Sequence, residues 1–186
     1  VAIVKLIEEI GDFPEGVVNI VTGPGRIIGD EIATNPDVDA ISFTGDTVTG
    51  KTLTKKAADK VKKLALELGG KSPNILFADA NLDKAIPVVA NSIFITAGQM
   101  CFAGTRVIVH ESIHEEVVER LRQEAEKLKV GDGMEESTDM GPVISEEQLK
   151  KVLEYCEIGK LDAKLVTGGN RLTGGEYDRG FFVEPT

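Results

Sequence analysis

Short apolar runs alternate with longer mixed segments along the first 70 residues. Residues 17–21, 40–43 and 64–68 are brief, aliphatic or β-branched, and bounded by glycine or polar residues. Runs of this kind predict buried strands. The segments between them, 27–34 and 47–62, have helical length and composition, and the opening residues read as a further helix. The resulting βαβαβ order predicts parallel strands joined by crossover helices.

The pattern restarts after Gly70. Apolar runs predict strands at residues 73–77, 106–110, 164–167 and the closing residues 181–186, whereas apolar periodicity predicts helices at 82–96, 113–129 and 146–158. A loop rich in Gly, Asp and Ser covers residues 131–141. We therefore predict an α/β protein with a domain boundary at Gly69 and Gly70, which separates residues 1–69 from residues 70–186.

Glycine-rich turns follow the three strands predicted in the first part of the chain. Ligands of parallel sheets gather at the carboxyl ends of the strands, which here are residues 22–25, 44–46 and 68–70. Two of these turns could present backbone N–H groups to a phosphate, although neither has the dinucleotide-binding GxGxxG pattern and both are consistent with ordinary turns. Their key positions are Gly23, Gly25, Gly29, Gly45, Thr47 and Gly50.

Cys101 and Glu67 are the two side chains best suited to chemistry. Cys101 lies in a turn-prone stretch with glycines on both sides, which gives a thiol nucleophile access to a ligand. Taken alone, a single cysteine is more often a small buried apolar residue. Glu67 interrupts an apolar strand; if partly desolvated, its pKa would be raised and it could act as a general base. An exposed acid on the strand is the alternative.

Charge and cysteine content exclude several classes of function. The formal net charge of −10 disfavours nucleic-acid binding, which needs a concentrated basic face. No apolar run reaches the ~18 residues of a membrane span. The two cysteines, Cys101 and Cys156, are far apart and lack metal-ligand spacing, so we predict no disulfide framework, no metal site and a reducing, cytoplasmic location. Cys156, His110 and His114 are interpreted as structural or solvated.

Three motifs, taken in their order and at their distances, resemble the core of the aldehyde dehydrogenase superfamily. They are Phe43-Thr44-Gly45-x-Thr47-x-x-Gly50, then Leu66-Glu67-Leu68-Gly69-Gly70-Lys71-Ser72-Pro73-Asn74, then Gly98-Gln99-x-Cys101-x-Ala103-Gly104-Thr105-Arg106. Residues 17–23 and the pair Gly141-Pro142 fit the same family. The resemblance implies an internal piece of a longer enzyme, with the end of a three-layer, Rossmann-like cofactor domain before Gly70 and part of a thiol-bearing catalytic domain after it.

The resemblance implies a mechanism. Cys101 would attack an aldehyde to give a thiohemiacetal, and hydride transfer to NAD(P)+ would leave a thioester. Water activated by Glu67 would then hydrolyse the thioester to a carboxylic acid, with the Cys101 N–H as one oxyanion donor. A relative that passes the acyl group to coenzyme A, and a non-catalytic binding or structural protein, remain alternatives. The family's second oxyanion donor and its ribose-binding residues have no counterpart in this chain, so we expect these 186 residues alone to be inactive.

The family pattern also implies a cofactor site. Gly25 and Gly29 would lie near the adenosine, and Thr44, Leu68 and Gly69 near the nicotinamide. The cofactor-binding residues implied are Gly25, Gly29, Phe43, Thr44, Gly45, Asp46, Thr47, Gly50, Leu68 and Gly69.

Asp46 departs from the family, which commonly has Ser there to donate to a cofactor phosphate. An ionised Asp cannot donate and repels phosphate, and it is expected to cap the following helix instead. A 2′-phosphate nearby would fit poorly, so NAD is preferred to NADP. Met100 and Phe102 would border the pocket and favour an apolar or mid-sized aldehyde, although packing alone explains them equally well. Family membership also implies a homodimer or homotetramer.

Overall fold

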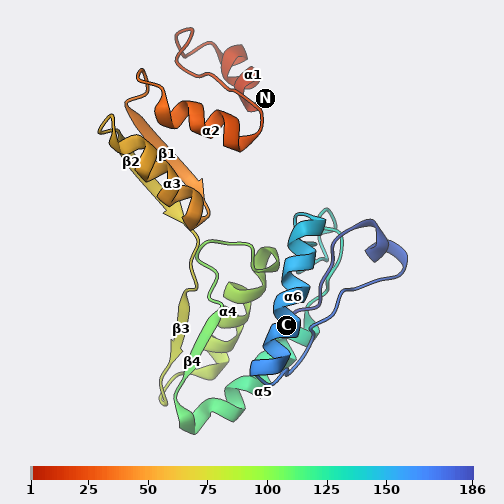
Figure 1. The fold of residues 1–186 in the computed structure, drawn as a ribbon. Coiled ribbons are helices and arrows are strands. Elements are labelled where there is room, and N and C mark those ends of the chain that lie inside the picture. Colours follow the sequence, from red (N-terminus) through yellow and green to blue (C-terminus); the bar gives the residue numbers. More distant parts are fainter. Residues whose placement is uncertain (1) are drawn as a thin grey trace. The chain divides into compact units, whose positions relative to one another are not determined.

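The computed structural model describes residues 2–186, which form two compact units, Val1–Leu68 and Gly69–Thr186. Each unit contains one pair of parallel strands joined by a helix (Figure 1). The first unit comprises α1 (Ala2–Ile10), α2 (Gly25–Thr34), β1 (Ala40–Gly45), α3 (Thr47–Ala58) and β2 (Lys63–Leu68). The second comprises β3 (Pro73–Leu76), α4 (Leu82–Phe94), β4 (Arg106–Val109), α5 (His114–Lys127) and α6 (Glu146–Asp162), with short 3-10 turns η1 (Ile95–Gly98), η2 (Glu111–Ile113) and η3 (Gly175–Arg179). The predicted α/β class is confirmed.

In the first unit, one face of the sheet is covered and the other is open. β1 and β2 pair in parallel from Ala40 opposite Lys63 to Gly45 opposite Leu68, with α3 as the crossover. Alternate strand residues join α2 and α3 in a small core of Ala33, Ile41, Leu53 and Ala57. The intervening strand residues are exposed, because no helix of this unit covers their face. Side chains on the open face are therefore available to a ligand.

Lys62 ties the end of α2 to the start of β2. Its side chain is buried, and Nζ donates to the carbonyls of Asn35, of Val38 at 2.8 Å and of Ile32 at 3.5 Å. A cation at a helix C-terminus is favoured because the last carbonyls of a helix have no partners within it. The same residue explains why α3 ends four residues before the predicted limit: the backbone turns at Val61, with φ of 51°, to bring Lys62 back toward α2.

Three predicted strands were wrong. Residues 17–21 form no strand, and Val17 and Val21 are 61% and 74% exposed. Residues 164–167 are irregular, because Gly168 and Gly169 follow at once with φ of 75° and 90° and turn the chain away. The closing residues make only one bridge, from Val183 to Arg171. A strand needs a neighbour along its whole length for its N–H and C=O groups. Within residues 2–186 no strand pairs with residues 17–21 or 164–167, and residues 181–184 make only isolated backbone bonds to positions 143, 170 and 172. The βαβαβ unit predicted for residues 17–68 is therefore a single βαβ unit, β1–α3–β2, preceded by α2.

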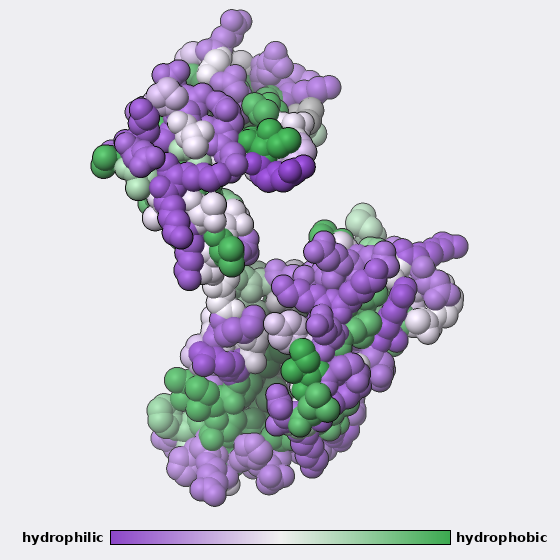
Figure 2. All heavy atoms as spheres, in the orientation of Figure 1, coloured by the Kyte–Doolittle hydropathy of each residue, from purple (hydrophilic) through white to green (hydrophobic). Residues whose placement is uncertain are grey.

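In the second unit, β3 and β4 pair in parallel from Pro73 opposite Arg106 to Leu76 opposite Val109. α4 is the crossover and packs with α5 on one face of the sheet, where Leu76, Leu82, Ile86, Val89 and Val117 form the core. The opposite face exposes Ile75 and Ile108. Figure 2 shows apolar side chains gathered at the surface over β3 and β4.

Two smaller apolar clusters hold the last third of the chain. Val143, Leu149 and Val183 form one, which fixes the start of α6 against the closing residues. Val130, Met140 and Phe182 form the other, where Phe182 packs edge-on against Tyr177 with ring centroids 5.4 Å apart. Both clusters include Ala97, which lies four residues before Cys101. The segment that carries the cysteine is therefore fixed to the body of the second unit.

Replacing Lys62 with Met is expected to weaken the first unit, because the change removes charge-assisted hydrogen bonds to the end of α2. Each such bond stabilises by about 2 kcal/mol. Amide hydrogen exchange in α2 and β1 should accelerate by at least about 30-fold, the equivalent of losing one such bond. Lys63→Met, at the exposed neighbouring position, is the matched control and should change exchange by less than about threefold. Equal effects of the two substitutions would contradict this role for Lys62.

Candidate active site

Cys101 occupies the outer part of a tight turn. The Ala103 N–H donates to the carbonyl of Met100 at 3.1 Å, so Cys101 and Phe102 are the two central residues of a four-residue turn. Ala103 is only 2% exposed and anchors the turn, whereas Cys101 is exposed and Phe102 is 63% exposed. Met100 is half-buried. The turn therefore presents the thiol outward with an apolar side chain on each side of it.

The backbone that enters this turn is left-handed over three successive residues. Thr96 and Ala97 have φ of 50° and 54°, and Gly98 has φ of 71°. For residues with a side chain this conformation costs about 1–2 kcal/mol each, so the surrounding contacts must hold it. Gln99 supplies two of them: its Oε1 accepts from the N–H of Ile144 at 2.9 Å, and its Nε2 donates to the carbonyl of Thr96 at 3.1 Å. Gln99 thus connects the turn at Cys101 to the segment that follows Gly141-Pro142.

The segment after Gly69 lies along the far side of the same turn. A Cβ atom placed on Gly70 would stand 3.4 Å from the carbonyl oxygen of Cys101. Arg106 Nε donates to the carbonyl of Lys71 at 2.8 Å, and Asn74 Nδ2 donates to the carbonyl of Gly104 at 3.0 Å. Residues 70–74, from the predicted glutamate motif, therefore lie along the segment from Cys101 to Arg106. Because the chain reaches β4 from α4, this turn stands at the amino end of the strands.

Glu67 and Thr44 share the open face of the first unit's sheet. They are opposite one another in the parallel register of β1 and β2, and both are exposed. The partial burial suggested for Glu67 is not seen in this unit, because no helix of the unit covers that face. A carboxylate in this position is free to meet water and a ligand. Its neighbour Leu68 points to the opposite face, so any contact of Leu68 with a ligand on the open face would come from its backbone.

Two of the predicted cofactor glycines lie in close contact with side chains of the same unit. A Cβ on Gly50 would lie 2.8 Å from Leu68 Cδ2, and a Cβ on Gly45 would lie 2.5 Å from Phe43 Cζ. Real Cβ atoms do not approach carbon so closely, and protein interiors have little room to adjust. The absence of side chains at these positions lets Leu68 lie against α3 and lets the Phe43 ring fold over the end of β1. Gly25, Gly29 and Gly69 have open space beside them instead.

Asp46 caps α3, as the sequence predicted. Its Oδ1 accepts from the N–H groups of Val48 at 2.8 Å and Thr49 at 3.2 Å, and its Oδ2 accepts from the Thr49 hydroxyl at 2.5 Å. Thr47 is the first residue of the helix. The amides of the first turn of α3 are therefore engaged by a carboxylate. By contrast, the N-cap of α2 is Pro24, which makes no side-chain capping bond, and Gly25 follows it.

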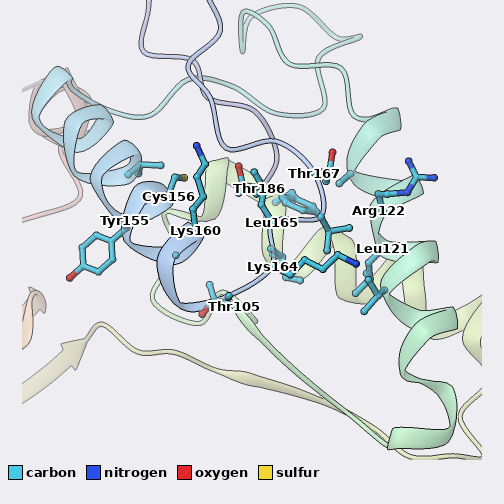
Figure 3. A pocket seen from close by; sticks show the side chains of 18 of the residues that line it. Thr105, Leu121, Arg122, Tyr155, Cys156, Lys160, Lys164, Leu165, Thr167 and Thr186 are labelled. Atoms are coloured by element: carbon cyan, nitrogen blue, oxygen red, sulfur yellow. The ribbon is translucent and has the colours of Figure 1, made fainter.

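A cavity of about 910 Å³ lies elsewhere in the second unit. It is bounded by side chains of α5 and α6 and by residues 163–167, and Figure 3 shows Cys156 and Lys160 of α6 directed toward it. The pKa of Lys160 is raised, first by its hydrogen bond to Glu157, 2.6 Å away. Cys156 was interpreted as structural, and only the folded chain places it beside a cavity. Thr105 reaches this cavity, whereas Cys101, Met100 and Phe102 are not among the residues that line it.

Two further features concern residues 2–186 as a whole. No helix in this range is long and apolar enough to cross a bilayer. Within the same range, no group of three or more His, Cys, Asp or Glu side chains is placed to hold a metal ion. Sequence reasoning did not identify Gln99 and Asn74 as residues that hold the turn at Cys101, although both lie inside the quoted motifs. Their position within those motifs was the available signal.

Comparison with known proteins identifies the family of this chain. The sequence matches the aldehyde dehydrogenase family over residues 1–186. It is 49% identical over 187 residues to betaine aldehyde dehydrogenase from Bacillus subtilis, covering 100% of this chain and 38% of the relative. It is 46% identical over 184 residues to an aldehyde dehydrogenase from Alternaria alternata, covering 98% of this chain and 36% of that protein. The chain thus spans little more than a third of the length of these relatives.

Solved structures agree with the sequence relatives. The crystal structure of betaine aldehyde dehydrogenase from Staphylococcus aureus in complex with NAD+ has a TM-score of 0.94 and 39% identity, and the match covers 99% of this chain and 36% of that one. A protein from Thermus thermophilus has a TM-score of 0.92, also at 39% identity, over 97% of this chain and 36% of its own. Sequence and fold lead to one conclusion: the chain belongs to the aldehyde dehydrogenase family.

Proposed function

We propose that the full-length protein oxidises an aldehyde to a carboxylic acid with NAD+, with Cys101 as the nucleophile and Glu67 as the general base. The observation that carries this proposal is the turn itself. Cys101 is exposed at its tip, while Ala103 is buried beneath it and Gln99 and Gly104 are hydrogen bonded to other elements. A thiol held outward on a fixed backbone is what attack on a carbonyl requires.

In the proposed reaction, the thiolate of Cys101 bonds to the aldehyde carbon and the carbonyl π electrons move to oxygen. The backbone N–H of Cys101 is one proposed donor to that oxyanion. Loss of hydride from the same carbon leaves an acyl group joined to sulfur as a thioester. Attack by water then breaks the carbon–sulfur bond, which releases the acid and restores the thiolate.

Glu67 is proposed to take a proton from that water. It is exposed on the open face of β2, where it can accept a proton without a rearrangement of the core. Three positions along the chain separate it from Gly70, which approaches the carbonyl oxygen of Cys101. The base and the segment that supports the nucleophile are therefore joined by a short stretch of chain.

NAD+, when bound, would supply the hydride acceptor. Its proposed site uses the uncapped start of α2 at Gly25, the open space beside Gly29, and Thr44 on the open face of β1. The Gly45 to Gly50 turn and the backbone of Leu68 and Gly69 complete it. The structural relative from Staphylococcus aureus is an NAD+ complex, which supports this cofactor. The carboxylate of Asp46 would repel an additional phosphate, which favours NAD over NADP.

The proposed substrate is an apolar or mid-sized aldehyde, because Met100 and Phe102 flank the thiol with apolar surface. Two relatives are named for betaine aldehyde, which should therefore be tested beside simple aliphatic and aromatic aldehydes. Two unpaired cysteines fit a reducing, cytoplasmic location. The proposed assembly of the full-length protein is a homodimer or homotetramer.

Cys101→Ala and Glu67→Gln should separate the two halves of the reaction. With the full-length protein and a panel of aldehydes, Cys101→Ala should abolish NADH formation and form no acyl-enzyme. Glu67→Gln should give a single turnover of NADH and then accumulate the thioester, detectable as a mass increase on Cys101, because the deacylating water has lost its base. Cys156→Ala is the matched control for loss of a thiol and should keep wild-type activity.

The product identifies the deacylating nucleophile. Formation of the free acid in the absence of coenzyme A supports hydrolysis. Turnover that requires coenzyme A and yields acyl-CoA would assign the protein to the acyl-transferring class instead. A wild-type full-length protein that forms no NADH with any aldehyde of the panel would refute the proposed oxidation.

Asp46→Ser is expected to tighten the binding of NAD+. Serine retains the N-cap of α3 but removes a negative charge close to the proposed phosphate site. Removing one such repulsion of about 1 kcal/mol at the protein surface should lower the dissociation constant about fivefold, measured by calorimetry. Asn81→Ser makes the same kind of cap exchange at α4 and should leave NAD+ binding unchanged. An unchanged or larger dissociation constant for Asp46→Ser would count against a phosphate at this turn.

A further inference from the structure

We propose that Asn74 is a positioning residue for the nucleophile: its carboxamide joins β3 and α4 to the segment that carries Cys101. The inference rests on the proposed function of Cys101, because it concerns how that thiol is held. Asn74 does not lie among the groups expected to touch substrate or cofactor. Its effect on the reaction would act through the backbone at Gly104.

Asn74 is half-buried on β3 and donates two hydrogen bonds from one nitrogen. Nδ2 lies 3.0 Å from the carbonyl oxygen of Gly104 and 3.0 Å from Oγ of Ser92 in α4. The Ser92 hydroxyl donates in turn to the carbonyl of Val89 at 2.8 Å, and the Gly104 N–H donates to the carbonyl of Ser92 at 3.0 Å. These hydrogen bonds link β3, α4 and the segment at Gly104 in one polar junction.

The direction of each bond in this junction is fixed. A serine hydroxyl has one hydrogen, and the Ser92 hydrogen is directed to Val89. Its oxygen must then accept from position 74, as must the carbonyl of Gly104. Position 74 needs a side chain with N–H donors at this distance, which asparagine provides. Aspartate has the same shape but no donor when ionised, and its oxygens would face two other oxygens.

Gly104 is matched to Asn74 by shape. A Cβ on residue 104 would collide with Nδ2 of Asn74 and would lie 2.7 Å from Oγ of Ser92. Any side chain at 104 would therefore push the carboxamide out of the junction. The carboxamide of Asn74 thus fills the space that a side chain at position 104 would need. The presence of asparagine at 74 accounts for glycine at 104.

The junction fixes the far end of the cysteine turn. Gly104 lies three residues after Cys101, and between them the buried Ala103 closes the turn through its bond to Met100. The near end is fixed by Gln99 through Ile144. Without Asn74, the Gly104 N–H bond to Ser92 would be the one hydrogen bond left, among the residues the structure describes, between the far end of the turn and α4. A shift of 1 Å in a nucleophile can cost about 100-fold in rate, so a looser end should reduce turnover more than binding.

The test compares Asn74→Asp and Asn74→Ala with Asn81→Ala in the full-length protein. Asn81 is the matched control because its side chain also bonds to the backbone, accepting from the Lys84 N–H at 3.2 Å, but at the opposite end of α4. For both Asn74 variants, kcat for aldehyde oxidation should fall by about 10–100-fold while both KM values change by less than about threefold. Asn81→Ala should keep kcat within about twofold of wild type.

A second measurement does not depend on activity. Amide hydrogen exchange in residues 99–105 should accelerate at least tenfold in Asn74→Asp and in Gly104→Ala, and should be unchanged in Asn81→Ala. Alkylation of Cys101 by iodoacetamide, normalised to Cys156 by peptide mass spectrometry, should stay within about threefold of wild type, because the free reagent needs an exposed thiol rather than an aligned one.

Each outcome has one meaning. Wild-type kcat and wild-type exchange in Asn74→Asp would overturn the inference. An equal loss of kcat in Asn81→Ala would also overturn it, because the effect would then be general weakening of α4. If the wild-type full-length protein oxidises no aldehyde, the proposed function fails, while hydrogen exchange at residues 99–105 still decides whether Asn74 holds the turn.

Discussion

Parallel pairing is the constraint from which the arrangement of the site follows. Two parallel strands cannot be joined by a hairpin, so the chain must return along the full length of the sheet before it pairs again. In the second unit that return is made by α4, and the segment that brings the chain from α4 into β4 is the segment that carries Cys101. Cys101 is therefore at the amino edge of its sheet, while Glu67 is near the carboxyl end of β2. Residues 69–72 connect these two edges directly.

A second consequence is that the turn at Cys101 needs support from other parts of the chain. A return segment has no ladder of hydrogen bonds, and this one includes Thr96 and Ala97 in a conformation that disfavours side chains. Support comes from single polar contacts with distant parts of the chain, through Gln99 to Ile144 and through Asn74 to Gly104. Glycine at 104 is needed for one of these contacts to fit. Packing therefore restricts the residues of the motif from Gly98 to Arg106 as much as the proposed chemistry does.

The sequence predicted the parts of the fold that depend on neighbouring residues. Four elements lie within a few residues of their expected limits: β1, β2, α4 and α5. Their apolar periodicity and local caps such as Asn81 can be recognised within a short stretch of sequence. The strands expected at 17–21 and 164–167 failed because a strand depends on a partner that a short window does not contain. Cys101 and Glu67 were predicted from the order and spacing of the family-like motifs. The hydrogen bonds of Asn74 and Gln99 join residues 30 and 45 positions apart, and no local pattern predicts them.

The open apolar face of β3 and β4 has a consequence for how the chain is made. β3 leaves the ribosome before α4 and the cysteine turn, so its partner β4 is absent while those residues are synthesised, which takes on the order of seconds. During that interval Ile75 has neither a strand beside it nor a layer above it, and it stays exposed even after pairing. Ile75 and Ile108 therefore leave an apolar strip on this unit both before and after the two strands pair, and such a strip favours contact with other extended apolar chains.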